Sequence, residues 1–261
     1  MAEQLHNSKE HIAIERLLGN AYETFNKQLL CISGRIVLWG AVESKDGLRD
    51  RYLVNKGRKL LVDRRHRLTS EEEIEWIDVD NAAIAAWEYL QWARNNSGQP
   101  IAKESLATYW SAFESCLKSI ATAFRLASGG GSQKNNLFVP PSALNAERRK
   151  VAQQWSSAAY RDAPKGKLFF EAEIVQKNPF PGRFKFTELG DTTWGRIGAA
   201  YQARNAIVHS MGLATEQFDF DGRSLYAGDS IDVTASALRE ICEDFRKVLD
   251  PFRTEISISD L

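Results

Sequence analysis

The sequence is short of cysteine and of long apolar runs, and each shortage excludes a class of protein. Its 261 residues include only Cys31, Cys116 and Cys242, which are far apart and lack the paired spacing of metal or redox sites. Unpaired thiols of this kind are typical of a reducing compartment. No apolar run is long enough to span a bilayer. We therefore expect a cytoplasmic protein with no membrane partner.

The protein also has no formal net charge, because Lys plus Arg and Asp plus Glu each total 34. A protein that binds nucleic acid over its whole surface is usually strongly basic, so any contact with RNA must be local. The sequence also lacks the Gly-x-Ser-x-Gly, His-Glu-x-x-His and paired-cysteine patterns of common hydrolases and metal sites. We therefore expect neither a metal nor another cofactor.

What the sequence has in plenty is helical periodicity. Apolar residues make up 43% of the chain, which is enough for a sizeable core, and many recur at helical spacing. These patterns predict helices over residues 11–39, 78–95, 101–127, 143–160 and 234–250. An Asp-Gly turn between apolar residues predicts a short β-hairpin over residues 217–226. The aromatic segment over residues 165–190 is expected to be an irregular connection.

A further helix is predicted between Asp191 and Gly212. Asp191, Thr192 and Thr193 offer capping oxygens for the first turn, and Gly212 suits a left-handed C-terminal cap. Arg204 falls on the stripe that should face the core, where an unpaired guanidinium costs several kcal/mol. We therefore expect Arg204 to contact a carboxylate, a phosphate or a second protein surface. The other members of this stripe are Trp194, Ile197, Tyr201, Val208 and Met211.

Two more polar residues of this helix flank Arg204. Asn205 and His209 lie on one flank because they are four residues apart. Arg204 and His209, five residues apart, diverge by roughly 140°, so one helix aims them poorly at a single atom. Two copies related by a two-fold axis would pool an Arg from one chain with a His from the other.

The run from Arg204 through Asn205 to His209, near the end of the penultimate helix, resembles the catalytic signature of the HEPN superfamily. The resemblance covers roughly the C-terminal two-thirds of the chain. It implies an all-α fold, an up-and-down helical bundle over residues 75–255, preceded by an N-terminal helical extension over residues 1–74. The short hairpin before the last helix is more similar to the RiboL-PSP-type nucleases of this superfamily.

The resemblance also implies a function, that of a metal-independent endoribonuclease in a toxin–antitoxin or phage-defence system. Such enzymes act as homodimers with a composite active site on RNA such as tRNA or mRNA, and an inhibitor or antitoxin is an expected partner. Cleavage by a 2′-hydroxyl would leave a 2′,3′-cyclic phosphate and a 5′-hydroxyl. His209 would act as acid or base, Arg204 would bind the phosphate oxygens, and Asn205 would orient the His or the substrate.

Two further sets of residues are candidates for supporting roles. Glu114 stands beside the apolar stripe of the predicted helix over residues 101–127, where it could pair with Arg204 or equally with Lys118. The most basic segment of the chain is a candidate RNA-binding face that includes Arg58, Lys59, Arg64, Arg65 and Arg67. The same charges also fit a solvated helix that pairs with the acidic run over residues 71–73.

Two non-catalytic interpretations of the sequence stay open. The chain could be a helical interaction module in which Arg204 is buried against Glu114. It could also be a nucleic-acid-binding scaffold built on the basic segment, one that binds RNA without cleaving it.

Overall fold

The computed structural model describes residues 12–43, 92–93, 95–129, 138–160, 164–180 and 182–253. The chain divides into two compact units, one of residues 32–105 and the other of residues 1–31 together with 106–261. The described residues are mostly helical, so the predicted predominance of helix is confirmed, whereas the HEPN arrangement of those helices stays a prediction. The predicted boundary between residues 74 and 75 lies outside the described residues.

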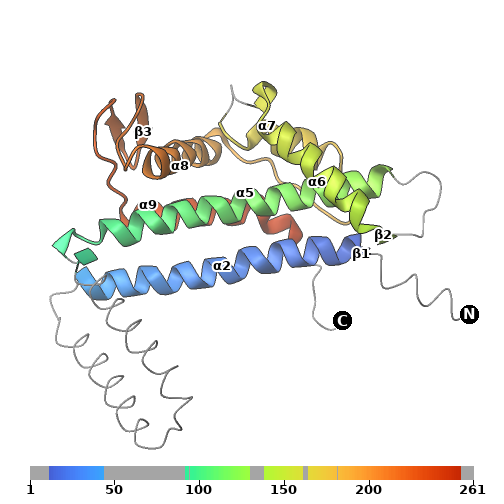
Figure 1. The fold of residues 1–261 in the computed structure, drawn as a ribbon, viewed down its shortest axis with the longest axis horizontal. Coiled ribbons are helices and arrows are strands. Elements are labelled where there is room, and N and C mark those ends of the chain that lie inside the picture. Colours follow the sequence, from blue (N-terminus) through green and yellow to red (C-terminus); the bar gives the residue numbers. More distant parts are fainter. Residues whose placement is uncertain are drawn as a thin grey trace, which may run out of the picture. The chain divides into compact units, whose positions relative to one another are not determined.

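The described elements alternate long helices with short strands and turns of helix, as Figure 1 shows. In chain order they are β1 (Ile12–Ala13), α2 (Ile14–Glu43), α5 (Gln99–Gly129), β2 (Phe138–Val139), α6 (Pro141–Trp155), the 3₁₀ helix η1 (Ala158–Tyr160), α7 (Lys167–Phe169), the π-helix η2 (Phe170–Val175), α8 (Asp191–His209), β3 (Phe218–Phe220), β4 (Arg223–Leu225), α9 (Ala235–Leu249) and the 3₁₀ helix η3 (Asp250–Phe252). Strands β1 and β2 pair antiparallel, as do β3 and β4.

α2 and α5 begin and end within a few residues of the predicted bounds. The apolar stripe predicted for α5 is fully buried and consists of Leu106, Trp110, Phe113, Leu117, Ile120 and Phe124. In the first turns of α2 the buried residues are Ile14, Leu18, Phe25 and Leu29. Both stripes recur at helical spacing, so periodicity identified these helices correctly. The helix predicted over residues 78–95 lies almost wholly outside the described residues.

The segment between α6 and α8 differs from the prediction of an irregular connection. Its first part forms α7 and η2, in which Phe169, Phe170 and Ile174 are buried. Packing against the helices therefore stabilises helical turns that lack an amphipathic pattern of their own. The predicted irregular structure is correct for residues 176–180 and 182–190, which contain no helix or strand.

An aromatic cluster joins α5 to the later helices. Phe113 of α5 stacks on Phe245 of α9 with 4.1 Å between ring centroids. The ring centroid of Trp110, also on α5, lies 5.2 Å from that of Tyr201 on α8 and 6.5 Å from that of Trp155 on α6. Aromatic pairs contribute about 0.5–1.5 kcal/mol beyond the area that they bury, so this cluster holds α8 firmly against α5.

β3 and β4 form the predicted hairpin, which contacts α8. Phe218 lies opposite Leu225, and Asp221 and Gly222 make the turn with φ angles of 52° and 71°. Positive φ at both turn residues is the type I′ geometry that matches the twist of a hairpin. Figure 1 shows the hairpin beside α8. The turn at Asp221 and Gly222 therefore places the two strands next to the helix that carries Arg204, Asn205 and His209.

α9 follows the hairpin and begins where the sequence predicted. The Thr234 hydroxyl oxygen accepts a hydrogen bond from the backbone N–H of Ala237 at 3.1 Å, which caps the first turn. One carboxylate on this helix, Asp244, is completely buried. It accepts two hydrogen bonds from Arg196 of α8, at 2.6 and 3.0 Å, and one from Lys247 at 3.0 Å. This ion pair joins α8 to α9.

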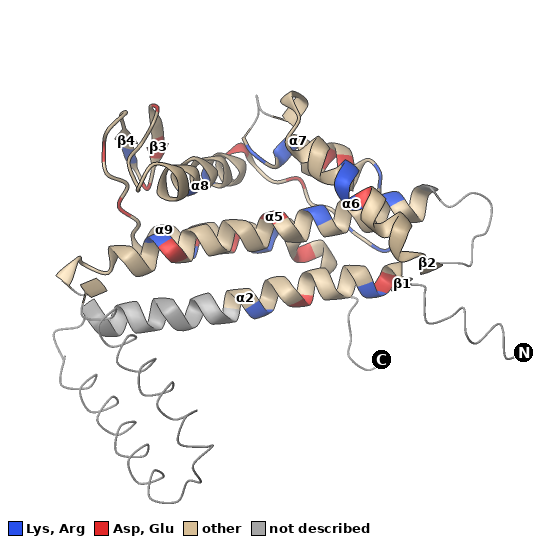
Figure 2. Ribbon diagram, viewed as in Figure 1, with Lys and Arg blue, Asp and Glu red and all other residues tan. Residues whose placement is uncertain are grey.

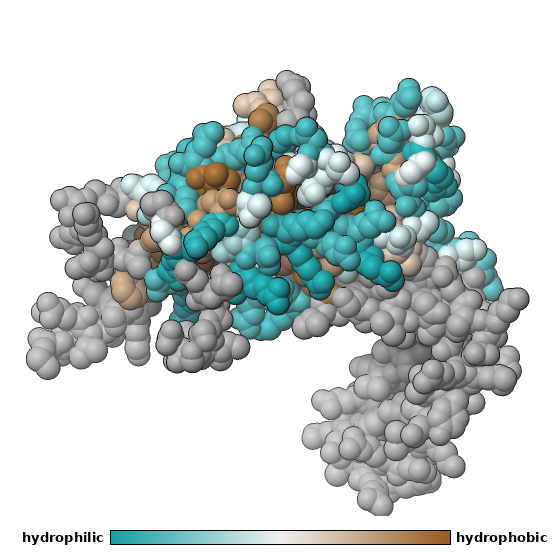
Figure 3. Space-filling view, turned by 180° about the vertical axis from the view of Figure 1, so that it is seen from behind, coloured by the Kyte–Doolittle hydropathy of each residue, from teal (hydrophilic) through white to brown (hydrophobic). Residues whose placement is uncertain are grey.

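The described surface is mostly hydrophilic on the face shown in Figure 3, where apolar side chains form only small patches. Some large apolar side chains are nevertheless exposed, and three of them follow one another at the C-terminal end of α8: Val208, Met211 and Leu213. We call these three residues the terminal patch. No described helix combines the length and the apolar character that crossing a membrane requires.

Candidate functional site

α8 carries Arg204, Asn205 and His209, and its two ends are capped in different ways. At the start, Gly190 is the N-cap and no side chain caps the helix, so the predicted cap by Asp191, Thr192 or Thr193 is wrong. The Asp191 carboxylate instead accepts a hydrogen bond from Nζ of Lys167 at 2.7 Å. At the other end, Gly212 has a φ of 82° and its N–H donates to the Ala206 carbonyl at 3.0 Å. The predicted left-handed end is confirmed.

The buried stripe of α8 is shorter than predicted. Trp194 and Ile197 are 2% and 0% exposed, as expected of core residues. Val208 and Met211, which the sequence assigned to the same stripe, are 48% and 96% exposed, so that part of the prediction is wrong. Periodicity shows which side of a helix is apolar but not how far its neighbours extend, and the last buried residue of α8 is Ala206.

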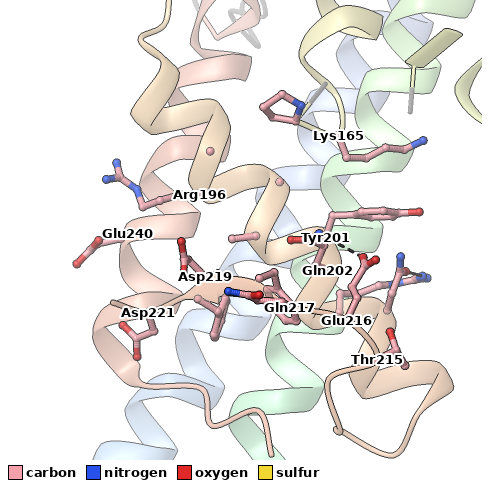
Figure 4. A pocket seen from close by; sticks show the side chains of 18 of the residues that line it. Lys165, Arg196, Tyr201, Gln202, Thr215, Glu216, Gln217, Asp219, Asp221 and Glu240 are labelled. Carbon is pink, nitrogen blue, oxygen red and sulfur yellow. Dashed lines mark hydrogen bonds between the residues drawn. The ribbon is translucent and has the colours of Figure 1, made fainter. Parts of the chain in front are cut away.

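A cavity of 1450 Å³ lies between α8 and the hairpin, with further walls from α5, α6 and α9. Arg204 and Asn205 line it, as do Glu114 and Tyr201. Figure 4 shows this cavity, with Lys165 and Tyr201 on one side of the view and Glu240, Asp219 and Asp221 on the other. The fold therefore places most of the predicted catalytic residues on the wall of one large cavity.

Arg204 is half-buried and is only partly satisfied by its neighbours. Its Nη1 donates to Oδ1 of Asn205 at 2.9 Å. Its Nε is buried and has no hydrogen-bond partner among the described residues. A buried donor without an acceptor costs about 1–3 kcal/mol. Arg204 therefore carries a buried N–H for which the described residues supply no acceptor.

Glu114 lines the same cavity but has other partners. Its carboxylate accepts a hydrogen bond from Nε1 of Trp110 at 2.9 Å and pairs with Lys118 one turn along α5. Of the two pairings that the sequence allowed, the pair with Lys118 is the one that forms. No ion pair links Arg204 to a described carboxylate, so the positive charge of Arg204 stays available to a ligand.

His209 lies apart from Arg204 and Asn205. It is the last residue of α8, it is exposed, and it does not line the cavity. Its sequence neighbours at this end of the helix are the residues of the terminal patch. This placement agrees with the divergence of roughly 140° expected for residues five apart on a helix. Within one chain, the structure brings Arg204 and Asn205 together at the cavity and leaves His209 at the outer surface.

Sequence analysis missed Lys165, which brings another cation to the cavity wall. Its Nζ donates to the Trp155 carbonyl oxygen at 2.7 Å. The same ammonium lies 4.7 Å from the ring centroid of Trp155 and 5.5 Å from that of Tyr201. These contacts hold the ammonium in place. The position of Lys165 in a Pro-Lys-Gly turn gave no signal that separates it from an ordinary surface lysine.

Several carboxylates also line the cavity. They come from the hairpin, the loop before it and α9, and they are Glu216, Asp219, Asp221 and Glu240. Figure 2 shows acidic positions on the hairpin in red. Asp219 and Asp221 each accept a hydrogen bond from a hydroxyl group, at 2.6 and 2.7 Å. The cavity wall thus carries cationic side chains, among them Lys165 and Arg204, together with these carboxylates.

The remaining predicted site residues are not placed. Arg58, Lys59, Arg64, Arg65 and Arg67 lie outside the described residues, so the RNA-binding role of the basic segment stays a prediction. In the part of the chain that the structure describes, no three His, Cys, Asp or Glu side chains are grouped so that they could hold a metal ion.

No protein-family model, curated protein or solved structure matches this chain. The resemblance to the HEPN superfamily therefore rests on Arg204, Asn205 and His209 and on their helical context. What that resemblance implies about activity remains a hypothesis that the geometry of the cavity has to support.

Proposed function

We propose that the protein is a cytoplasmic, metal-independent endoribonuclease of the HEPN type. The observation that supports this most strongly is Arg204, which lines a large cavity and has no ion pair with a described carboxylate. A phosphate bound in the cavity would neutralise the guanidinium, and charge-assisted hydrogen bonds of this kind are the strong ones. Every nucleotide of an RNA chain carries such a phosphate.

The proposed reaction uses a nucleophile that RNA itself carries. The substrate 2′-oxygen attacks the adjacent phosphorus while the bond from phosphorus to the 5′-oxygen breaks. One proton leaves the 2′-hydroxyl and one reaches the 5′-oxygen, so the products carry a 2′,3′-cyclic phosphate and a 5′-hydroxyl. Arg204 stabilises the additional negative charge on phosphorus. His209 acts as the acid or the base.

Asn205 has a more specific role in this proposal than the sequence suggested. Its Oδ1 accepts the hydrogen bond from Arg204 Nη1 at 2.9 Å, so it orients the guanidinium rather than the imidazole. Holding one Nη in this way leaves the second Nη without a hydrogen-bond partner among the described residues. A planar, preorganised guanidinium binds phosphate oxygens in pairs.

The proposed site needs a second copy of the chain, because His209 lies outside the cavity that Arg204 lines. The terminal patch next to His209 supplies apolar surface for that contact, with Val208, Met211 and Leu213 exposed by 48%, 96% and 46%. In a two-fold dimer formed through this patch, each chain would bring its His209 to the Arg204 of its partner. The active enzyme is then a homodimer with composite sites.

The test is cleavage of a mixed pool of tRNA and single-stranded RNA in the presence of EDTA, followed by mapping of the fragment ends. The wild type should leave cyclic-phosphate ends, and His209→Ala should lower the rate by about 10²–10⁴-fold, as loss of an acid or base does. The His209 side chain is exposed and makes no hydrogen bond to a described residue, so this variant should keep its melting temperature. Cleavage that EDTA abolishes and magnesium restores would disprove the metal-independent mechanism.

The second candidate function is a non-catalytic helical interaction module. The terminal patch favours it, because its three large apolar side chains are exposed and close in sequence, and exposed apolar surface is suited to binding other proteins. On this hypothesis the patch binds a different protein, such as an inhibitor or antitoxin, and RNA stays intact with both wild type and His209→Ala. A nucleic-acid-binding scaffold based on Arg58 to Arg67 is the remaining alternative, and it would bind RNA in a salt-dependent way without cleaving it.

A further inference from the structure

Tyr201 brings a hydroxyl group to the cavity wall beside the two polar residues of the proposed phosphate site. It lies on α8 three residues before Arg204 and four before Asn205, so the three side chains are neighbours on one face of the helix. All three line the cavity. The Tyr201 hydroxyl makes no hydrogen bond to a described residue. It is therefore a donor that a ligand at Arg204 can reach.

This hydroxyl differs from the others in the cavity lining in its burial. Tyr201 is half-buried, whereas the other lining residues with hydroxyl groups are exposed, namely Ser156, Thr192 and Thr215. An exposed hydroxyl exchanges water for a ligand with little net gain. A hydroxyl on a partly buried wall binds an anion more strongly, because the effective dielectric constant is lower there. Among these residues, Tyr201 is the one suited to bind a phosphate oxygen.

The Tyr201 ring is held in place by its contacts within the fold. Its centroid lies 5.2 Å from that of Trp110, a side chain with no exposure to solvent. The ammonium of Lys165 lies 5.5 Å from the ring centroid, and Figure 4 shows the Lys165 and Tyr201 side chains extending in the same direction. A cation over an aromatic ring is attracted to it. The hydroxyl is thus positioned before a ligand binds, which lowers the entropy cost of binding.

A glycine on α8 allows Lys165 to lie beside this ring. Pro164, the residue before Lys165, packs against α8 at Gly198, which is one turn before Tyr201. A Cβ atom at position 198 would lie 3.3 Å from Cβ of Pro164 and 3.4 Å from its Cα, so Pro164 would have to shift. The absence of a side chain at Gly198 therefore lets the segment with Lys165 approach the helix.

We infer that the Tyr201 hydroxyl donates a hydrogen bond to an oxygen of the phosphate that Arg204 binds. The guanidinium supplies the charge, and the hydroxyl supplies a second donor from a neighbouring position on α8, so together they fix the orientation of the phosphate. This inference rests on the proposed function, because it takes the ligand of the cavity to be a phosphate of RNA. Tyr201 is then a further substrate-binding residue, and its hydroxyl keeps its proton during the reaction.

Tyr201→Phe tests the hydroxyl alone, because phenylalanine keeps the ring and its contacts with Trp110 and Lys165. The measurement is a binding titration of the full chain with a single-stranded RNA oligonucleotide in which fluorine replaces every 2′-hydroxyl group, so that no cleavage can occur. The variant should bind about tenfold more weakly than the wild type, as expected for loss of a hydrogen bond to a charged group. Its melting temperature should not change, since the hydroxyl has no partner among the described residues.

The matched control is Tyr226→Phe, which makes the same change at a tyrosine that is 56% exposed and lies outside the cavity lining. It should bind the oligonucleotide as the wild type does. The double variant Tyr201→Phe, Arg204→Met tests whether the two side chains contact one phosphate. Their losses of binding free energy should then be non-additive, because a shared ligand couples the two residues.

Three results would overturn the inference. They are wild-type affinity in Tyr201→Phe, an equal loss of affinity in Tyr201→Phe and Tyr226→Phe, and losses that simply add in the double variant. A wild type that does not bind the oligonucleotide would overturn it as well.

The outcome for the inference is separable from that for the nuclease. Weaker binding by Tyr201→Phe together with an RNA pool that the wild type leaves intact would support the phosphate contact and refute the endoribonuclease. Cleavage by the wild type, with unchanged cleavage and binding by Tyr201→Phe, would support the endoribonuclease and refute the contact.

Discussion

Replacing Arg196 by Ala is expected to destabilise the protein substantially, because the partner of Arg196 is a carboxylate with no access to water. Asp244 is 0% exposed and accepts hydrogen bonds from Arg196 at 2.6 and 3.0 Å. Removing one partner of a buried ion pair typically costs about 3–5 kcal/mol. Lys247 remains at 3.0 Å from Asp244, and the Arg196 side chain is 37% exposed, so we expect the lower end of that range.

The measurement is reversible unfolding in urea, with thermal melting as a second observable. A loss of about 3 kcal/mol corresponds to a fall in melting temperature of roughly 6–12 °C for a chain of this size. Arg239→Ala is the matched control, because Arg239 is an exposed arginine on α9, the helix that carries Asp244, and has no ion pair to a described residue. It should change the unfolding free energy by less than about 0.5 kcal/mol.

The double variant Arg196→Met, Asp244→Leu should recover much of the loss, because replacing both partners of a buried pair by apolar residues is often neutral. If Arg196→Ala and Arg239→Ala destabilise the protein equally, the ion pair does not hold α8 against α9, and this reasoning is wrong.

Three further predictions concern single side chains. Arg204→Met should leave the melting temperature unchanged or raise it, because Arg204 has an unsatisfied buried N–H and no described ion pair. Cleavage of RNA by this variant should fall by at least about tenfold. A clear loss of stability without loss of activity would refute this prediction. Met211→Glu should convert the dimer to monomer in sedimentation velocity, since Met211 is 96% exposed in one chain and belongs to the proposed dimer contact; an unchanged sedimentation coefficient would exclude this face. Burial raises the pKa of the Cys116 thiol from 9.0 to about 12. Cys116 should therefore react with maleimide at pH 8 only when the protein unfolds. The contribution of the buried thiol to the free energy of unfolding is full below pH 9 and should fall as the pH rises toward 12.

The sequence predicted those parts of the fold whose cause is local. The stripe of α5 repeats every three to four residues, and the whole stripe is buried. Asp221 and Gly222 tolerate positive φ, which a type I′ turn requires at both positions. Thr234 supplies a capping oxygen one residue before α9. Each of these features needs only neighbours along the chain, so a single sequence is enough to reveal it.

The sequence did not predict features that depend on which elements meet. Val208 and Met211 continue an apolar stripe, but the neighbours that bury the rest of α8 do not reach them. Phe169 and Phe170 form helical turns because of their burial, without a periodic pattern. Lys165 and Glu216 line the same cavity although they are 51 positions apart in the sequence. Only the fold shows that such distant side chains share one site.

The partners of the neighbouring carboxylates explain why Arg204 is the candidate for ligand binding rather than Arg196. Both arginines lie on α8 and both line the cavity. α5 and α9 each present a carboxylate toward this region, but Asp244 is taken by Arg196 and Glu114 by Lys118. Arg204 is left with Asn205, a neutral partner that satisfies one of its five N–H groups.

A half-buried guanidinium without a counter-ion is costly for the folded chain, since its charge is partly removed from water. The same property strengthens its attraction for a phosphate, because the effective dielectric constant is lower there than at an open surface. Binding an anion at Arg204 should therefore stabilise the fold as well as position the substrate. Inorganic phosphate should raise the melting temperature of the wild type and leave that of Arg204→Met unchanged, and an equal rise in both would place the anion elsewhere.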